Sequence, residues 1–292
     1  MLREGANMRS IANRDSLAVY DPQDCGDSDA ARLYCEVMID ARMTKAPKTV
    51  PDKLKRDAIV EAIFEIRFDT KTIAEVLFGR LADFAPWKGF SQKQLPAYQI
   101  PAPMRSVDPN LRYAPVFELE DQEDHRAVRI GAYVLSYHQK APYTGWAAFK
   151  PKLSQLIEAL FAKSEDLTIR RLGFRYLNAL SSDVHRIKAV SDLDLKIIVA
   201  DETLPGNLNL NFTTDLSDKA QCTLRIATAD FTQGALPPNT SIVVDVDVFT
   251  TETFKTRSEA EVKEWLEFAH THEKEQFFRL LPTSTIDALK EE

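Results

Sequence analysis

The sequence predicts an α+β protein in which helices pack on one face of a curved antiparallel sheet. Three observations support this prediction. Apolar and polar residues alternate in several segments, as they do in half-buried strands. Other segments carry apolar residues at helical spacing, and the order of strands and helices in the first half recurs loosely in the second. The recurrence suggests a duplicated β-α-β-β-α-like unit, with the outline of a helix-grip or TATA-binding-protein-like architecture.

The first half of the chain contains three strand-like and two helix-like segments. The alternating segments, of which the last two form a hairpin, are residues 58–68, 116–120 and 127–139. Helical spacing predicts a helix over residues 72–84 and another after the hairpin, with Thr144 as its N-cap. The proline-rich stretch 86–115 between them excludes a long helix.

The second half adds more strands and a long closing helix. The segments predicted as strands are residues 168–180, 207–214, 220–231 and 241–251. Residues 183–199 show no clear period. The closing helix runs from about Ser258 to Leu281, where Pro282 ends it.

We divide the chain into an N-terminal tail and two α+β halves that share one continuous globular unit. Residues 1–50 show no sustained periodicity, and Met43 stands just before the first strong element. We therefore interpret this tail as disordered or as a misassigned start, or alternatively as an arm that docks on a partner. The first half covers residues 51–166 and the second residues 167–292.

Charge, hydropathy and cysteine content limit the classes of function. The formal net charge is −7, which does not favour nucleic-acid binding because that needs a basic stripe. No apolar stretch is long enough to cross a bilayer or to act as a secretory signal, so we expect a cytoplasmic protein with no membrane contact. The cysteines at 25, 35 and 222 lack the spacing of a disulfide or zinc site. Glycine-rich phosphate loops and nucleophile motifs are also missing, so we expect no cofactor and no metal.

Charged residues gather on the predicted faces of two strands. Strand residues two apart share a face, so Glu61, Glu65 and Arg67 point to one side of the first strand. Arg171 and Arg175 likewise share one side of the strand over 168–180. Such faces are commonly solvated surfaces held by cross-strand ion pairs. Alternatively they line a groove in which the arginines donate to a carboxylate or phosphate.

Two further sets of residues favour simpler interpretations. Asp245 and Asp247 share a strand face but need a third ligand to hold a divalent cation, and the sequence does not place one. Tyr143, Trp146 and Phe149 are typical of a packing cluster at the start of a helix.

Four segments resemble a sporadically distributed family of uncharacterised bacterial proteins of similar size. They are IVEAIFEIRF at 59–68, YTGWAAF at 143–149, RRLGFRYLNAL at 170–180 and WLEFAHTHEKEQFF at 265–278. The resemblance runs from about Leu54 to the C-terminus. It implies an intracellular bacterial protein. The family has no established activity, cofactor or catalytic residue that the resemblance could transfer to this chain.

The sequence therefore predicts a non-enzymatic binding or interaction module that uses the curved sheet as a surface or groove. The expected partner is a protein or a small anionic ligand, bound through Arg171 and Arg175 with Glu61, Glu65 and Arg67 close by. The alternative is an enzyme that acts on an anionic small substrate through the same arginines and carboxylates. Exposed edge strands also allow a homodimer.

Overall fold

A computed structural model describes residues 50–51, 54–199, 202–203, 206–232 and 236–290. Most of the predicted N-terminal tail thus lies outside the described residues. The chain divides into two units, one combining residues 1–42 with 197–204 and the other combining 43–196 with 205–292. In the first unit the structure describes a short antiparallel pair, β7 (Ile198–Val199) and β8 (Glu202–Thr203). All other described elements belong to the second unit.

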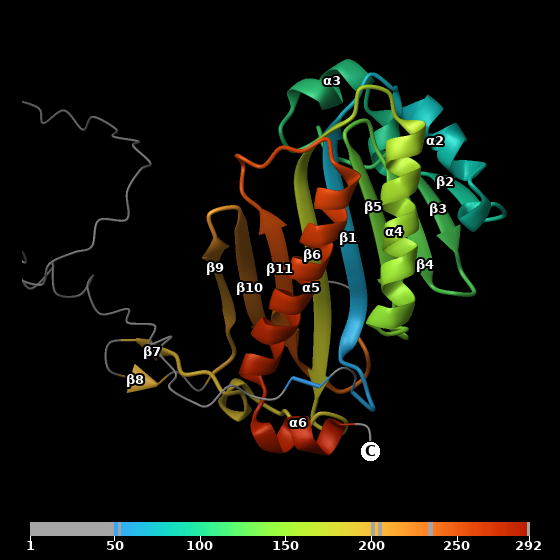
Figure 1. Cartoon of the computed structure of the whole chain (residues 1–292). Coiled ribbons are helices and arrows are strands. Elements are labelled where there is room, and N and C mark those ends of the chain that lie inside the picture. The colour runs from blue at the N-terminus through green and yellow to red at the C-terminus, as the bar shows by residue number, and fades with distance from the viewer. Residues whose placement is uncertain (1–49, 52–53, 200–201, 204–205, 233–235, 291–292) are drawn as a thin grey trace, which may run out of the picture. The chain divides into compact units, whose positions relative to one another are not determined.

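Nine antiparallel strands of the second unit form one sheet, in the order β2-β3-β4-β5-β1-β6-β11-β10-β9 (Figure 1). Their bounds are β1 Ile59–Asp69, β2 Ser91–Gln94, β3 Phe117–Asp121, β4 Arg126–Ile130, β5 Val134–Lys140, β6 Thr168–Ser181, β9 Asn209–Ser217, β10 Ala220–Thr228 and β11 Thr240–Thr250. The sheet crosses the boundary between the two predicted halves, because β1 and β6 pair directly.

Three helices lie on one face of this sheet, as Figure 1 shows. They are α2 (Ala74–Ala82), α4 (Trp146–Lys163) and α5 (Glu259–Leu280). The short helices α3 (Ala102–Val107) and α6 (Thr283–Leu289) lie near opposite ends of the sheet. The predicted α+β class, an antiparallel sheet with helices packed on one face, is confirmed.

The strand order has a symmetric outline about the central pair. From β1 the sheet continues outward through β5, β4 and β3, and from β6 it continues through β11, β10 and β9. In each half a long helix, α4 or α5, follows the strand that returns beside the central one. A duplicated unit would produce this order, and the duplication itself stays a prediction.

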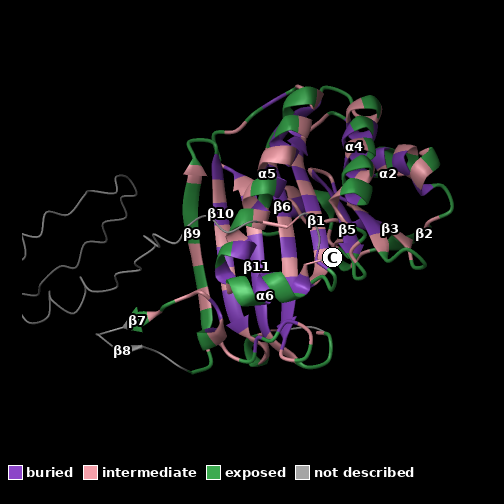
Figure 2. Ribbon diagram, turned by 60° about the horizontal axis from the view of Figure 1, so that its bottom comes forward, coloured by how far each residue is buried: buried purple, intermediate pink, exposed green. Residues whose placement is uncertain are grey.

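The core lies between the sheet and the helices. Alternate residues of β1, including Phe64, Ile66 and Phe68, are fully buried, and Phe174 of β6 continues the same layer. Figure 2 shows the buried residues concentrated in the central strands, whereas β9 at the edge is largely exposed. Burying each such side chain contributes roughly 1.5–3 kcal/mol, so this layer holds the central strands in register.

Local structure departs from the sequence prediction at two turns. The strand predicted over 127–139 is two strands, β4 and β5, because the chain turns after Ile130. A Cβ atom on Gly131 would stand 2.7 Å from the carbonyl oxygen of Ala114, so only glycine fits this turn. The predicted cap Thr144 is also wrong: Gly145, with φ of 84°, occupies the N-cap of α4.

The elements that the sequence did not predict include β2, α3 and α6. The short edge strand β2 lies within the proline-rich stretch and pairs with β3. Helix α6 begins directly after Pro282, which ends α5 as predicted and also starts the next helix. Ser258 caps α5 by accepting a hydrogen bond from the backbone N–H of Glu261 at 3.3 Å.

Candidate functional site

The face of the sheet opposite α2, α4 and α5, here called the polar face, holds the five charged residues that the sequence predicts to bind a ligand. Glu61, Glu65 and Arg67 lie on β1, and Arg171 and Arg175 lie on the neighbouring β6. The β1–β6 register places Arg67 opposite Arg171. Their contacts nevertheless separate the five residues into different groups.

Arg175 and Glu61 each have a partner of their own. Arg175 donates two hydrogen bonds to Asp245, from Nε to Oδ1 at 2.7 Å and from Nη2 to Oδ2 at 2.6 Å. This bidentate contact occupies the guanidinium fork and raises the pKa of Arg175. Glu61 lies 2.9 Å from Nδ1 of His138, and that hydrogen bond lowers the pKa of Glu61. Arg175 therefore does not share with Arg171 the open donor role that the sequence suggested.

Arg67 and Arg171 share the carboxylate of Glu65. The distances to Glu65 Oε1 are 2.7 Å from Arg67 Nε and 3.2 Å from Arg171 Nη1. Arg171 lies folded across Gly173, since a Cβ atom on that glycine would be 2.9 Å from Nη1. Because Gly173 has no side chain, the guanidinium group of Arg171 can lie against the backbone of the sheet.

A β-bulge brings another arginine to the same place. Arg67 pairs with Arg171, but Phe68 pairs with Ile169, so Arg170 is the extra residue on β6. Bulges re-aim side chains in this way. Strand alternation alone would turn Arg170 away from Arg171, whereas the bulge allows both to line one pocket.

This pocket, the arginine pocket, has a volume of about 530 Å³. Its lining residues include Arg67, Asp69, Arg112, Arg170, Arg171 and Glu252. Four arginines against two carboxylates leave an excess of two positive charges in the lining. Glu65 and Asp247 adjoin Arg171, and when both are ionised they balance that excess.

The arginines of the pocket are held by carboxylates and aromatic rings. Asp69 accepts from Arg170 Nε at 2.6 Å and lies 3.6 Å from Arg112 Nη2. The guanidinium of Arg67 lies 4.6 Å from the ring centre of Tyr113, and those of Arg171 and Arg112 stack similarly on Phe249 and Tyr133. Stacking on a ring leaves in-plane N–H donors for further partners.

Asp247 adds a titratable group beside the pocket. Its Oδ2 lies 3.9 Å from Arg171 Nη2. Desolvation by burial raises the pKa of Asp247 to about 6, although Arg171 and Arg175 act in the opposite direction. Around pH 6 this carboxyl therefore changes its charge next to the arginines.

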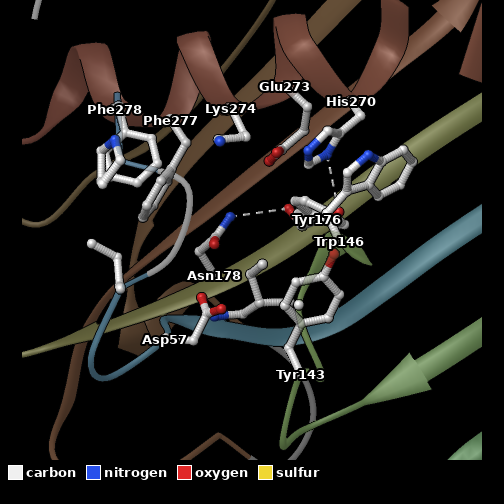
Figure 3. A pocket seen from close by; sticks show the side chains of 14 residues that line it. Asp57, Tyr143, Trp146, Tyr176, Asn178, His270, Glu273, Lys274, Phe277 and Phe278 are labelled. Atoms are coloured by element: carbon white, nitrogen blue, oxygen red, sulfur yellow. Dashed lines mark hydrogen bonds between the residues drawn. The ribbon is translucent and has the colours of Figure 1, made fainter. Parts of the chain in front are cut away.

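A second pocket lies on the helix side of the sheet, between α5, β6 and the segment before β1 (Figure 3). Its volume is about 50 Å³. We call it the α5 pocket. Its ring-bearing lining residues are Tyr143, Trp146, Tyr176, His270, Phe277 and Phe278, and its charged ones are Asp57, Glu273 and Lys274.

A chain of hydrogen bonds runs along one wall of the α5 pocket. The hydroxyl oxygens of Tyr143 and Tyr176 are 2.7 Å apart, and the Tyr176 hydroxyl lies 3.3 Å from His270 Nδ1. Burial lowers the pKa of His270 to about 3, so its ring is neutral and Nδ1 can accept from Tyr176. The His270 ring stacks on Trp146 with centres 3.8 Å apart. Tyr143 and Trp146 therefore do pack, as predicted, and they also line a pocket.

Glu273 is the most buried ionisable group of the α5 pocket. Its side chain projects from α5 toward the pocket in Figure 3, and the residue is 1% exposed. Burial raises its pKa well above the usual value, with Asp57 adding to the rise. Among the described residues, its Oε1 atom has no hydrogen-bond partner.

Sequence reasoning missed the residues that complete both pockets. The bulge at Arg170 and the loop that carries Arg112 depend on pairing that the sequence does not show. Glu273 did leave a signal, because it continues the buried stripe of α5 that contains Leu266, Ala269 and Phe277. A carboxyl on such a stripe is unusual, since buried acids need a partner or a function.

Among the described residues, no group of three or more His, Cys, Asp or Glu side chains is placed to hold a metal ion. His272 uses Nδ1 on the carbonyl oxygen of Phe268 at 2.9 Å. Within the described part of the chain, no helix is both long and apolar enough to span a bilayer.

Comparison with protein-family models and with curated proteins found no match to this chain. The resemblance to a bacterial family stated from the sequence therefore stays a prediction.

Proposed function

We propose that this protein is a binding module that holds a small organic anion in the arginine pocket on the polar face. The observation that carries the proposal is the convergence of Arg67, Arg112, Arg170 and Arg171 on one depression of about 530 Å³. Pockets of roughly 300–1,000 Å³ are typical of small-ligand sites. The guanidinium groups match a carboxylate or phosphate, which take paired N–H donors.

The rigidity of the site supports binding of a compact ligand. Arg67 and Arg171 are positioned by Glu65 and by the rings of Tyr113 and Phe249, so little side-chain entropy remains to be lost on binding. A protein partner with an acidic segment would use the same donors. The pocket shape favours the small anion. We propose that the protein binds this anion in the cytoplasm of a bacterium, because the cytoplasm keeps thiols such as that of Cys222 reduced.

Calorimetric titration at low ionic strength tests this proposal. The probes are sulfate, which has the geometry of phosphate, and succinate, which offers carboxylates. We expect at least one probe to bind, and the Arg67→Ala/Arg171→Ala double variant to lose about tenfold or more in affinity, because charged hydrogen bonds contribute roughly 1.5–3 kcal/mol each.

Arg225→Ala is the matched control for this titration. Arg225 lies on β10 and bonds to Asn209 and to the carbonyl oxygen of Phe231, outside the pocket. Its removal changes the net charge of the protein as each pocket substitution does, and it should leave affinity nearly unchanged. Equal loss in the control, or no binding of either probe, would count against a small-anion site.

An enzyme that acts on an anionic substrate is a second candidate, favoured by the raised pKa of Asp247 beside Arg171. A carboxyl with a pKa of about 6 is suited to proton transfer near neutral pH. Mass spectrometry of a bound ligand after incubation separates the two candidates. An unchanged mass supports a binding module, whereas conversion that Asp247→Asn abolishes without loss of binding supports the enzyme.

A further inference from the structure

The α5 pocket combines features that the arginine pocket lacks. Its wall is built largely from aromatic rings, contributed by β6, by α5, by the first residue of α4 and by the turn before it. Two carboxyl groups reach it, Glu273 from α5 and Asp57 from the segment before β1 (Figure 3). Lys274 is the one basic residue among the lining residues that the structure describes.

A buried carboxyl without a hydrogen-bond partner, in a pocket lined by aromatic rings, indicates which kind of ligand the pocket binds. Glu273 is 1% exposed, and within the described part of the chain its Oε1 atom accepts or donates no hydrogen bond. Buried polar groups in folded proteins nearly always have a partner, so an exception calls for an explanation. Aromatic faces attract cations, and a carboxylate completes such a site with charge and hydrogen bonds.

We propose that the α5 pocket is a binding site for the ammonium group of a small organic amine. The ammonium group lies against the rings of the pocket and donates a hydrogen bond to Glu273, while Asp57 supplies a second negative charge. With Glu273 ionised, Asp57 and Glu273 exceed Lys274 by one negative charge, which matches one bound cation. The small volume of about 50 Å³ admits the charged head, and the organic stem extends toward the opening.

Binding of the amine exchanges a proton for a cation. In the empty pocket burial raises the pKa of Glu273 well above its usual value, which favours the protonated carboxyl. When the ammonium enters, the Glu273 O–H bond breaks, the proton leaves to solvent and the carboxylate pairs with the ligand. Affinity therefore rises by about tenfold per pH unit for as long as Glu273 is protonated in the empty protein.

The neighbours of Glu273 with shifted pKa values would not make amine affinity change with pH in this way. The titratable groups around it are Asp57, Tyr143, Tyr176 and Cys222 from other segments and His270 and Lys274 from α5 itself. Burial raises the pKa of Cys222 to about 12 and that of both tyrosines above their usual value, and it lowers the pKa of His270 to about 3. These four groups therefore keep their charge between pH 6 and 8, and we assign the pH dependence of amine binding to Glu273.

The test is calorimetric titration of the whole chain with n-butylammonium chloride at pH 6, 7 and 8, with 1-butanol as the uncharged counterpart of equal length. We expect butylammonium to bind, butanol to bind at least tenfold more weakly, and the affinity for butylammonium to increase with pH. In Glu273→Gln we expect weaker binding that no longer changes with pH. Gln resembles the protonated acid in size and charge, so this variant should fold, and its thermal unfolding confirms that.

Glu275→Gln is the matched control, because Glu275 lies on the same helix and is exposed. It should bind butylammonium as the original protein does, with the same rise in affinity between pH 6 and 8. The proposal is overturned if butylammonium does not bind, if butanol binds equally well, or if folded Glu273→Gln keeps both affinity and pH dependence. Arg67→Ala/Arg171→Ala should leave butylammonium binding intact, so failure of the anion site and failure of this site are distinguishable.

Discussion

Replacement of Asp247 by Asn should stabilise the protein at alkaline pH. The folded state holds the pKa of Asp247 at about 6, compared with 3.8 for the unperturbed group, because burial disfavours the charged form. Between these values the folded protein binds a proton that the unfolded chain has lost. The free energy of unfolding therefore decreases as the pH rises from about 4 to 6, and the penalty is complete above that range.

The size of the effect follows from the shift in pKa. One pKa unit corresponds to about 1.36 kcal/mol, so a shift of about two units gives an upper limit of about 3 kcal/mol. The carboxyl side chain is 29% exposed, and solvent screening reduces that figure. We expect Asp247→Asn to raise the free energy of unfolding by about 1–2 kcal/mol at pH 8 and by almost nothing at pH 4.

Urea denaturation from pH 4 to 8 measures this difference, with Asp245→Asn as the control. Asp245 accepts the two hydrogen bonds of Arg175, so its substitution should destabilise the protein. If Asp247→Asn instead destabilises the protein at pH 8, the attraction of Arg171 and Arg175 exceeds the cost of burial and the argument is wrong.

Sulfate keeps its charge between pH 4 and 8, so its affinity for the arginine pocket should fall as Asp247 ionises. The Asp247→Asn variant should not show that fall.

Three further substitutions test the packing and the hydrogen bonds around the pockets. Arg175→Ala should lower the free energy of unfolding by about 1–2 kcal/mol in urea denaturation, because Asp245 is nearly buried and loses a bidentate partner; no loss would mean that solvent replaces the guanidinium. Phe174→Ala should cost about 3–5 kcal/mol by the same measurement, because this ring is fully buried between the sheet and the helices, and a loss below 1 kcal/mol would contradict tight packing there. Tyr143→Phe should cost about 1 kcal/mol by removing the 2.7 Å contact to Tyr176; an unchanged melting temperature would show that the contact contributes nothing.

Alternation along the sequence was sufficient to predict the central strands. In β1 the residues Ala62, Phe64, Ile66 and Phe68 are buried and the residues between them are less buried and mostly charged, so the period of two is visible in the sequence. The long helix α5 was likewise predicted nearly to its ends, because Ser258 caps it and Pro282 follows it. Each of these signals depends on residues that are close in the sequence, so a single sequence is enough to detect it.

Features that depend on pairing between distant segments could not be predicted. The bulge at Arg170 arises from the register between β1 and β6, and it is invisible in either strand alone. The break between β4 and β5 depends on how close Gly131 comes to the carbonyl oxygen of Ala114, which is again a contact between separate segments. The sequence therefore located Arg67 and Arg171 on suitable faces, and it could not show that Arg170 joins them while Arg175 is held by Asp245.

Strand β6 contributes residues to both proposed binding sites, which lie on opposite faces of the sheet. Arg171 lines the arginine pocket, while Phe174 is buried toward the helices and Tyr176 lines the α5 pocket. Because successive side chains of a strand point to opposite faces, a substitution at Arg171 removes a donor on one side without altering a contact on the other. A variant that weakens binding at both pockets would therefore have disturbed β6 itself. The pair of titrations, with sulfate or succinate on one face and butylammonium on the other, thus reports separately on each site and jointly on the integrity of the strand between them.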